Sequence, residues 1–105
     1  MGADYTNGIS TGRVSSGCEV NLGYKPRFIY LFYSTGSGDY YWNYYIYYIP
    51  CYNSSKGYMA CYRNKTGSSE QAGAKAHQEV TIADYITLTD TGFIAKKDYT
   101  YEIAY

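Results

Sequence analysis

Short runs of alternating apolar and polar residues, separated by turn-forming residues, make up most of the chain. The runs are rich in Val, Ile, Tyr, Phe and Thr, which suit the pleated, half-buried surface of a β-strand. Clusters of Gly, Ser, Asn and Asp recur between them, at residues 6–8, 15–17, 34–39, 53–57, 64–69 and 90–92. Helix signals are nearly absent. The pattern predicts an all-β fold, an antiparallel β-sandwich of about seven to nine short strands, in one domain over residues 1–105.

The first half of the chain contains the strand with the clearest pattern. In residues 28–34 both alternating faces are apolar, which predicts a central strand. A shorter strand is predicted at residues 18–22 and a long one at residues 40–51. Residues 58–64 are expected to pair back onto the long strand as a hairpin, through the turn at residues 53–57.

The segment 67–77 is small and polar. We expect it to be mainly loop, with residues 71–77 the only stretch able to form a helical turn. A half-buried strand is predicted over residues 80–88, where apolar residues recur at every second position. Asp84 falls in this apolar row, so its carboxylate must be paired, hydrogen-bonded or placed at a bulge.

The last residues of the chain predict a closing pair of strands. Residues 93–96 and 99–105 are expected to pair around Lys97 and Asp98. One face of the final strand is aromatic and apolar, formed by Tyr99, Tyr101, Ile103 and Tyr105. If this strand pairs internally, its removal should damage the fold.

Tyrosine is the strongest bias in the composition, with 17 tyrosines against three phenylalanines and one tryptophan. Twelve of the 17 lie between Tyr24 and Tyr62. In residues 40–48 the aromatic residues fall on both faces, with Tyr40, Trp42, Tyr44 and Tyr48 on one and Tyr41, Tyr45 and Tyr47 on the other. A strand buried on one side only does not need this arrangement. Tyrosine mixed with Ser, Gly and Asn is typical of binding loops, because it offers a large contact area, few rotatable bonds and a hydroxyl.

Three interpretations of these tyrosines stay open. They fill a wide core and its wet rim; or one face packs against a second copy of the chain; or the rings stack on the apolar faces of a carbohydrate while polar groups hold its hydroxyls. For the third interpretation, the candidate ligand-binding residues are Asp39, Tyr41, Trp42, Asn43, Tyr45, Tyr47 and Asn53. Charge that would protect strand edges is scarce, so we also expect a homo-oligomer.

Charge and composition exclude several classes of protein. At 46% apolar and 17% charged residues, the chain is not expected to be disordered. Nine Lys and Arg balance nine Asp and Glu, and residues 40–52 contain no basic side chain, which disfavours nucleic acid as a partner. No apolar run approaches the roughly 18 residues of a membrane-spanning helix, and no signal-peptide pattern is present. We therefore expect cytoplasmic synthesis and no membrane insertion.

The residues offer little chemistry for catalysis. The single histidine, His77, belongs to no G-x-S-x-G or H-E-x-x-H motif. Asp39 and Asp84 are the only carboxylates that we would name for a glycosidase, and nothing in the sequence places them together. Three cysteines without C-x-x-C spacing favour small reduced core residues, although Cys51 and Cys61 could face each other across a hairpin. We expect no enzyme activity, no cofactor and no metal site.

Two parts of the chain carry a resemblance to a known class of proteins. Residues 20–29, VNLGYKPRFI, resemble the leucine-glycine-aromatic-basic-proline turn that leads into an apolar strand in phage and prophage tail-fibre and baseplate domains. Residues 86–93, ITLTDTGF, and the ending YEIAY at residues 101–105 are similar to the last two strands of such domains. The resemblance implies a small β-sandwich at the tip or junction of a viral fibre, often trimeric and likened to H-type lectins. It implies no catalytic residues and carries over no ligand contact.

Together these features predict a non-catalytic domain of a phage-derived or prophage-derived structural or receptor-binding protein, carried in a virion or a tail-like particle. The domain is expected to bind a cell-surface glycan or a partner through its tyrosine-rich surface. The alternative is a purely architectural oligomerisation module of a viral fibre or tail, with no ligand.

Overall fold

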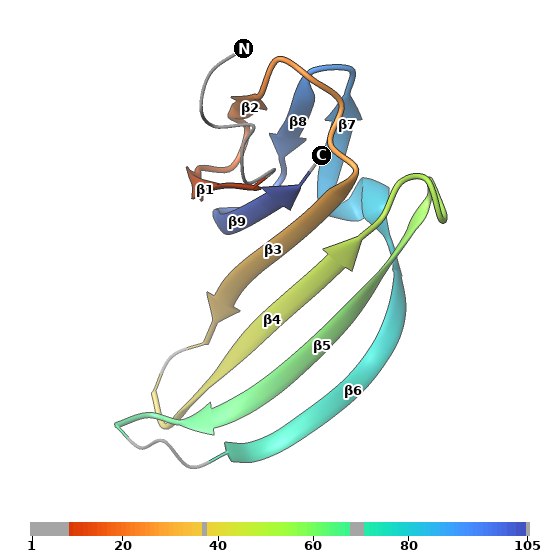
Figure 1. Ribbon diagram of the computed structural model, residues 1–105. Helices are drawn as coiled ribbons and strands as arrows, with labels where there is room; N and C mark the ends of the chain where they lie inside the picture. Colours follow the sequence, from red (N-terminus) through yellow and green to blue (C-terminus); the bar gives the residue numbers. More distant parts are fainter. Residues whose placement is uncertain (1–8, 37, 68–70, 105) are drawn as a thin grey trace.

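The computed structural model describes residues 9–36, 38–67 and 71–104, although not the side chains of residues 9, 71–72 and 74–77. The strands of these residues form two antiparallel sheets (Figure 1). The large sheet has six strands in the order β1-β9-β3-β4-β5-β6, and the small sheet has three in the order β2-β8-β7. The all-β sandwich of about seven to nine strands predicted from the sequence is therefore confirmed. The strands are β1 (Ile9–Val14), β2 (Glu19–Asn21), β3 (Phe28–Thr35), β4 (Tyr40–Tyr48), β5 (Lys56–Lys65), β6 (Gln71–Thr81), β7 (Ile86–Thr89), β8 (Gly92–Ala95) and β9 (Tyr99–Ala104).

The small sheet covers only part of the large one. In Figure 1, β2, β7 and β8 lie near β1 and β9, while β4, β5 and β6 run on well beyond them. Between the two sheets lies a core of aliphatic and aromatic side chains. Its fully buried members include Ile29, Leu31, Ile46, Tyr48, Ile86, Phe93 and Ile103.

Strand β3 is an interior strand, as its two apolar faces predict. It pairs with β9 on one side and β4 on the other. Ile29 and Leu31 face the small sheet and are fully buried, while their neighbours Tyr30 and Phe32 face the other way and are half-buried. The hairpin of β4 and β5 is also confirmed.

Strand β4 ends earlier than its pattern predicts, at Tyr48 rather than at residue 51. The backbone turns there, because the amides of Tyr52 and Asn53 both donate to the carbonyl of Ile49. Pro50 lies inside this turn and has no amide hydrogen to offer to a ladder. The apolar residues that follow β4 therefore belong to a loop.

Two predictions for the middle of the chain are wrong. Residues 71–77, expected to be loop or a helical turn, belong to strand β6, which pairs along β5. The edge of β5 supplies the hydrogen-bonding partner that the small, polar residues could not reveal by themselves. Residues 80–88 are not one strand, because a 3₁₀ turn, η2 (Ile82–Asp84), separates β6 from β7. Ile82 and Ile86 are still buried, and Asp84 is exposed on the turn, so its carboxylate never enters the core.

The predicted closing pair of strands is also wrong. β8 pairs with β2 and β7 in the small sheet, whereas β9 pairs with β1 and β3 in the large one. Lys97 and Asp98 therefore carry the chain from one layer to the other. Periodicity shows which face of a strand is buried but not which layer the strand joins, and both strands bury residues in the same core. Residue 105 lies outside the described residues.

Strand β1 is an element that the sequence pattern missed. It forms one edge of the large sheet and pairs with β9 over its whole length. Its residues STGRV after Ile9 are mostly small or polar, so they carry little strand signal. Gly12 allows close packing here, because a Cβ at that position would lie 2.6 Å from the hydroxyl of Tyr101.

Candidate functional site

The face of the large sheet that points away from the small sheet is lined with aromatic rings. We call it the outer face; its aromatic residues are Phe28, Tyr30, Phe32, Tyr41, Tyr45, Tyr47, Tyr58 and Tyr62. All of them keep part of their surface exposed, and Tyr47 is the most exposed at 38%. Within the described part of the chain, no second layer of strands lies over this face. Such a surface is available to a ligand or a partner.

The rings of the outer face contact one another across three strands. The register places Tyr30 opposite Tyr47 and Phe32 opposite Tyr45, so that these pairs stand directly across β3 and β4. Their ring centroids are 5.0 Å and 5.1 Å apart. The ring of Tyr45 also meets that of Tyr62 on β5 at 5.8 Å. The rings therefore form a continuous, mutually supported platform rather than separate exposed side chains.

Ala60 is a small, buried residue within this platform. It lies opposite Tyr45 on β5, on the outer face, and is only 4% exposed because larger side chains surround it.

Polar side chains border the platform on two sides. Toward the β3–β4 turn, Ser34 Oγ donates to Asn43 Oδ1 at 2.6 Å, and Asn43 Nδ2 donates to Asn64 Oδ1 at 3.1 Å. On the opposite side, the register continues the outer face onto β9 and β1 at Thr100, Glu102 and Arg13. Hydrogen-bonding groups thus flank an apolar centre, as in many ligand sites.

The hydroxyl of Tyr30, in the platform, stays protonated at neutral pH. Partial burial, followed by the nearby Tyr47, Tyr45 and Glu102, raises the pKa of Tyr30 from 10.0 to about 12. A neutral hydroxyl both donates and accepts a hydrogen bond. Tyr30 therefore presents a neutral donor and acceptor beside the ring faces of the platform.

The structure brings together four of the residues predicted from the sequence as ligand contacts. Tyr41, Asn43, Tyr45 and Tyr47 alternate along β4 on the outer face. Trp42 lies on the same strand but on the opposite face, which separates it from this group.

Trp42 belongs to a second aromatic cluster, on the far part of the inner face. The guanidinium carbon of Arg63 lies 4.8 Å from the ring centroid of Tyr40 and 6.0 Å from that of Trp42. Tyr33 and Tyr44 stack at 4.6 Å beside them. These rings, of which Tyr40 is exposed and the others are half-buried, stabilise the long strands where they extend beyond the small sheet.

The two remaining predicted residues lie at opposite ends of β4 (Figure 1). Asp39 is exposed in the β3–β4 turn. Asn53 lies in the β4–β5 turn, where its Oδ1 accepts hydrogen bonds from the amides of Ser55 and Lys56. This side chain therefore has a structural role in the turn.

Sequence reasoning missed five of the eight aromatic residues of the platform. Phe28, Tyr30 and Phe32 form one row, but the apolar pattern on both faces of β3 suggested burial rather than a surface. Tyr58 and Tyr62 on β5 were not singled out either. The signal that could have found them is the hairpin register, since pairing β4 with β5 places Tyr58 beside Tyr47.

The cysteines divide into one buried residue and two exposed ones. Cys61 is a small core residue, as predicted, whereas Cys18 and Cys51 are exposed, and all three are free thiols. Cys61 lies opposite Tyr44, while Cys51 follows the end of β4. The two cysteines of the hairpin therefore do not face each other.

The carboxylates considered for catalysis are far apart. Asp39 lies in the β3–β4 turn and Asp84 in η2, at opposite ends of the long strands in Figure 1. The side chain of His77 lies outside the described ones.

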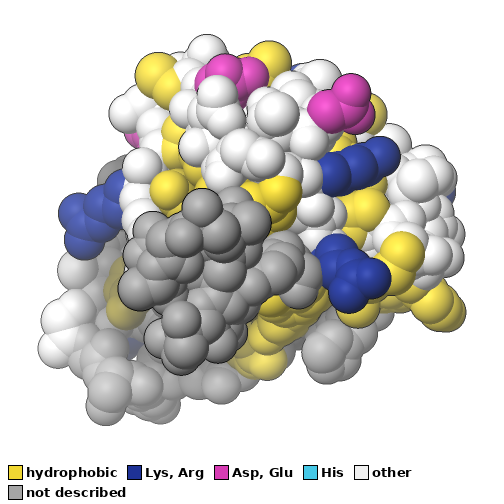
Figure 2. All heavy atoms as spheres, turned by 45° about the horizontal axis from the view of Figure 1, so that its top comes forward, with side chains coloured by type: hydrophobic (Ala, Val, Ile, Leu, Met, Phe, Trp, Pro, Cys, Tyr) yellow, Lys and Arg dark blue, Asp and Glu magenta, His cyan; other side chains and the backbone are white. Residues whose placement is uncertain are grey.

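In the face drawn in Figure 2, charged side chains stand apart with hydrophobic ones between them. Among the described residues, no helix has the length and apolar character needed to cross a membrane.

Comparisons with protein-family models, with curated proteins and with solved structures found no match for this chain. The case for a function therefore comes from the outer face and the groups that surround it.

Proposed function

We propose that this chain is a non-catalytic binding module of the phage-tail or prophage-tail type, and that it holds a cell-surface glycan on the outer face of its large sheet. The observation that carries the proposal is the continuous platform of partly exposed rings across β3, β4 and β5. In this role the domain belongs to a virion or a tail-like particle.

The chemistry of the platform suits a sugar. Sugar rings have apolar faces made of C–H groups, which pack against aromatic rings, and hydroxyl edges, which need donors and acceptors. The rings of Phe32 and Tyr45 supply the first, and the amide of Asn43 together with the tyrosine hydroxyls supplies the second. The paired residues of β3 and β4 carry no charged side chains, so neither strong anions nor strong cations are favoured there.

A second function, self-assembly, is favoured by the edge strands of the two sheets. β1 and β6 are the edge strands of the large sheet, and β2 and β7 those of the small one. Edge strands offer backbone hydrogen bonds to another chain. In this alternative the aromatic platform is the contact between copies in a homo-oligomer, a trimer if the resemblance to fibre domains holds.

A glycan array with two single variants separates these functions. Tyr45→Ala removes a ring from the outer face, while Trp42→Ala removes one from the other face of the same strand. For the glycan function, the wild type binds a sugar, Tyr45→Ala binds it at least about tenfold more weakly, and Trp42→Ala binds it normally. Light scattering should give the same mass for all three proteins.

The opposite pattern favours assembly. If the wild type binds no sugar and Tyr45→Ala forms a smaller species than the wild type, then the platform is a contact between copies and the glycan proposal is wrong.

A further inference from the structure

A pocket opens beside the outer face where β3 and β9 separate. Their pairing ends at Phe32 and Thr100, but β3 continues to Thr35 while the chain reaches β9 from Asp98. The gap left between them is a pocket of about 470 Å3, lined by residues of β1, β3 and β9. This volume falls within the range of roughly 300–1,000 Å3 that is usual for small-molecule sites.

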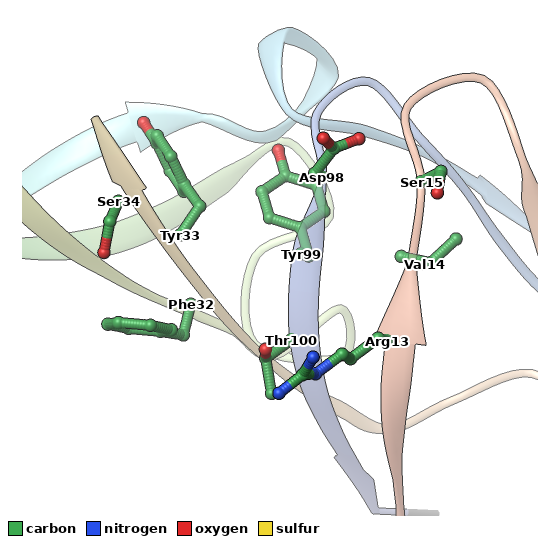
Figure 3. A pocket seen from close by; sticks show the side chains of 9 residues that line it. All are labelled: Arg13, Val14, Ser15, Phe32, Tyr33, Ser34, Asp98, Tyr99 and Thr100. Atoms are coloured by element: carbon green, nitrogen blue, oxygen red, sulfur yellow. The ribbon is translucent and has the colours of Figure 1, made fainter. Parts of the chain in front are cut away.

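The pocket has a basic group and an acidic group on either side of an aromatic wall. Figure 3 shows Arg13 reaching from β1 toward Thr100, and Asp98 on the other side of Tyr99. The guanidinium of Arg13 forms no ion pair with any residue that the structure describes, and its side chain is exposed. Its donors are therefore available to a ligand.

Asp98 is held in place by the backbone. Its Oδ1 accepts a hydrogen bond of 2.8 Å from the amide of Ser16, which fixes the carboxylate at the mouth of the pocket. The second oxygen of the carboxylate retains its capacity to accept a hydrogen bond. Arg13 can only donate and Asp98 can only accept, while the hydroxyl of Thr100 can do both.

These groups determine which ligand charge the pocket prefers. An anion would be attracted by Arg13 but repelled by Asp98, and a cation would meet the reverse. A neutral ring carries hydroxyls that can accept from Arg13 and donate to Asp98, and its apolar face can pack on the ring of Phe32.

The pocket is continuous with the aromatic platform. The register forms a row across four strands, from Arg13 to Thr100, then Phe32, then Tyr45. Phe32 lines the pocket and also contacts Tyr45 on the platform.

We infer that this pocket is the subsite for a neutral hexose unit at the end of a glycan chain, whose next units lie on the rings of the outer face. The inference rests on the proposed glycan-binding function and identifies the charge class of the sugar and the residues that hold it. Arg13 donates to its hydroxyls and Asp98 accepts from them.

The test uses an array of neutral hexose oligosaccharides and uronic acid oligosaccharides, with Arg13→Ala and Asp98→Asn. The amide introduced by Asp98→Asn keeps an oxygen that can accept from the Ser16 amide, so this variant retains the local fold. Arg27→Ala is the matched control, because Arg27 is an exposed arginine that lines a different pocket and its loss changes the net charge equally. We expect the wild type to bind neutral oligosaccharides, each pocket variant to bind at least about tenfold more weakly, and Arg27→Ala to bind normally.

Two results overturn the inference while leaving the proposed function intact. In the first, Tyr45→Ala abolishes binding but Arg13→Ala and Asp98→Asn bind as the wild type does. In the second, the wild type binds uronic acid oligosaccharides in preference to neutral ones. If the wild type binds no sugar of either class, the proposed glycan-binding function and this subsite are both wrong.

Discussion

The two faces of β3 carry equally apolar residues but have different surroundings. On the inner face Ile29 and Leu31 are 0% exposed beneath the small sheet. On the outer face the rings of Tyr30 and Phe32 contact the ring of Tyr45 on the neighbouring strand, and both side chains stay half-buried. Beneath the small sheet the inner face of β3 is aliphatic and closed at Ile29 and Leu31, whereas its outer face is aromatic and partly exposed at Tyr30 and Phe32.

This difference indicates a division of roles between the faces. Burial of aliphatic side chains stabilises the fold by about 25 cal/mol for each Å2 of apolar surface removed from water. Side chains that remain half-exposed contribute less, and their exposed area is available for binding. We therefore expect substitutions on the inner face to change mainly stability, and substitutions on the outer face to change mainly binding.

The largest effect is expected from Gly92→Ala, which disturbs the small sheet that packs on the inner face. A Cβ at Gly92 would lie 1.8 Å from the carbonyl oxygen of Val20, a contact that the pairing of β2 with β8 cannot accommodate. We expect a loss of about 3 kcal/mol or more in the free energy of unfolding, measured by urea denaturation.

Gly23→Ala is the control that measures the cost of placing an alanine at a positive φ without a steric clash. Gly23 also has a positive φ, of 81°, but nothing lies within 4 Å of its added Cβ. Its replacement should cost roughly 1–2 kcal/mol. Equal losses for the two variants would show that the clash at Gly92 is unimportant.

The next comparison is between Leu31→Ala and Phe32→Ala, adjacent residues on opposite faces of β3. Leu31 is fully buried, so its truncation should cost about 3 kcal/mol through lost burial and a cavity. Phe32 is half-buried, and its truncation should cost about 1 kcal/mol while it weakens glycan binding. If Phe32→Ala lowered the free energy of unfolding more than Leu31→Ala does, the outer face would have to be covered.

Alkaline pH should affect tyrosines on both faces. The pKa of Tyr30 on the outer face is raised from 10.0 to about 12, mainly by burial, and burial also raises the pKa of Tyr99 on the inner face. Because these pKa values are higher in the folded state, their contribution to stability is complete below pH 10 and is lost as the pH rises through 12. Urea midpoints should therefore be constant up to about pH 10 and fall above it. A midpoint that stays constant through pH 12 would contradict the burial of these hydroxyls.

The smallest effects concern single hydroxyls. Tyr99 is 3% exposed and donates a 2.8 Å hydrogen bond to the carbonyl of Tyr85, so Tyr99→Phe should cost about 1 kcal/mol. Tyr47 is 38% exposed on the outer face, and Tyr47→Phe should change stability by less than about 0.5 kcal/mol. Thermal unfolding of both variants checks this difference in stability. Equal shifts of the two unfolding midpoints would remove the distinction between the faces.

The elements predicted correctly are those whose local pattern agrees with their tertiary role. β3 and the hairpin of β4 and β5 have strong periodicity, and the structure confirms them. β1 and β6 are edge strands with small or polar residues, and their pairing depends on partners that a local pattern does not show. The predicted pairing of β8 with β9 failed for a related reason, since period-two alternation does not identify the sheet that a strand joins.

The candidate site was predictable only in part. Alternation along β4 placed Tyr41, Tyr45 and Tyr47 on one face, as the structure has them. The contribution of β3 depends on which of its two apolar faces the small sheet covers, and that is a property of the whole fold. The pocket at Arg13 depends on β1, so a sequence pattern that missed this strand could not reveal it.

The most direct test of an open outer face compares Tyr47 with Tyr48 by hydroxyl-radical footprinting and mass spectrometry. These residues are neighbours in β4, yet Tyr47 is 38% exposed and Tyr48 is 1% exposed. We predict that Tyr47 is oxidised rapidly in the free protein and becomes protected when the glycan identified on the array is added, while Tyr48 is oxidised slowly in both samples. If Tyr47 is as slow as Tyr48 without glycan, the outer face is covered in solution and cannot be the binding surface proposed for it.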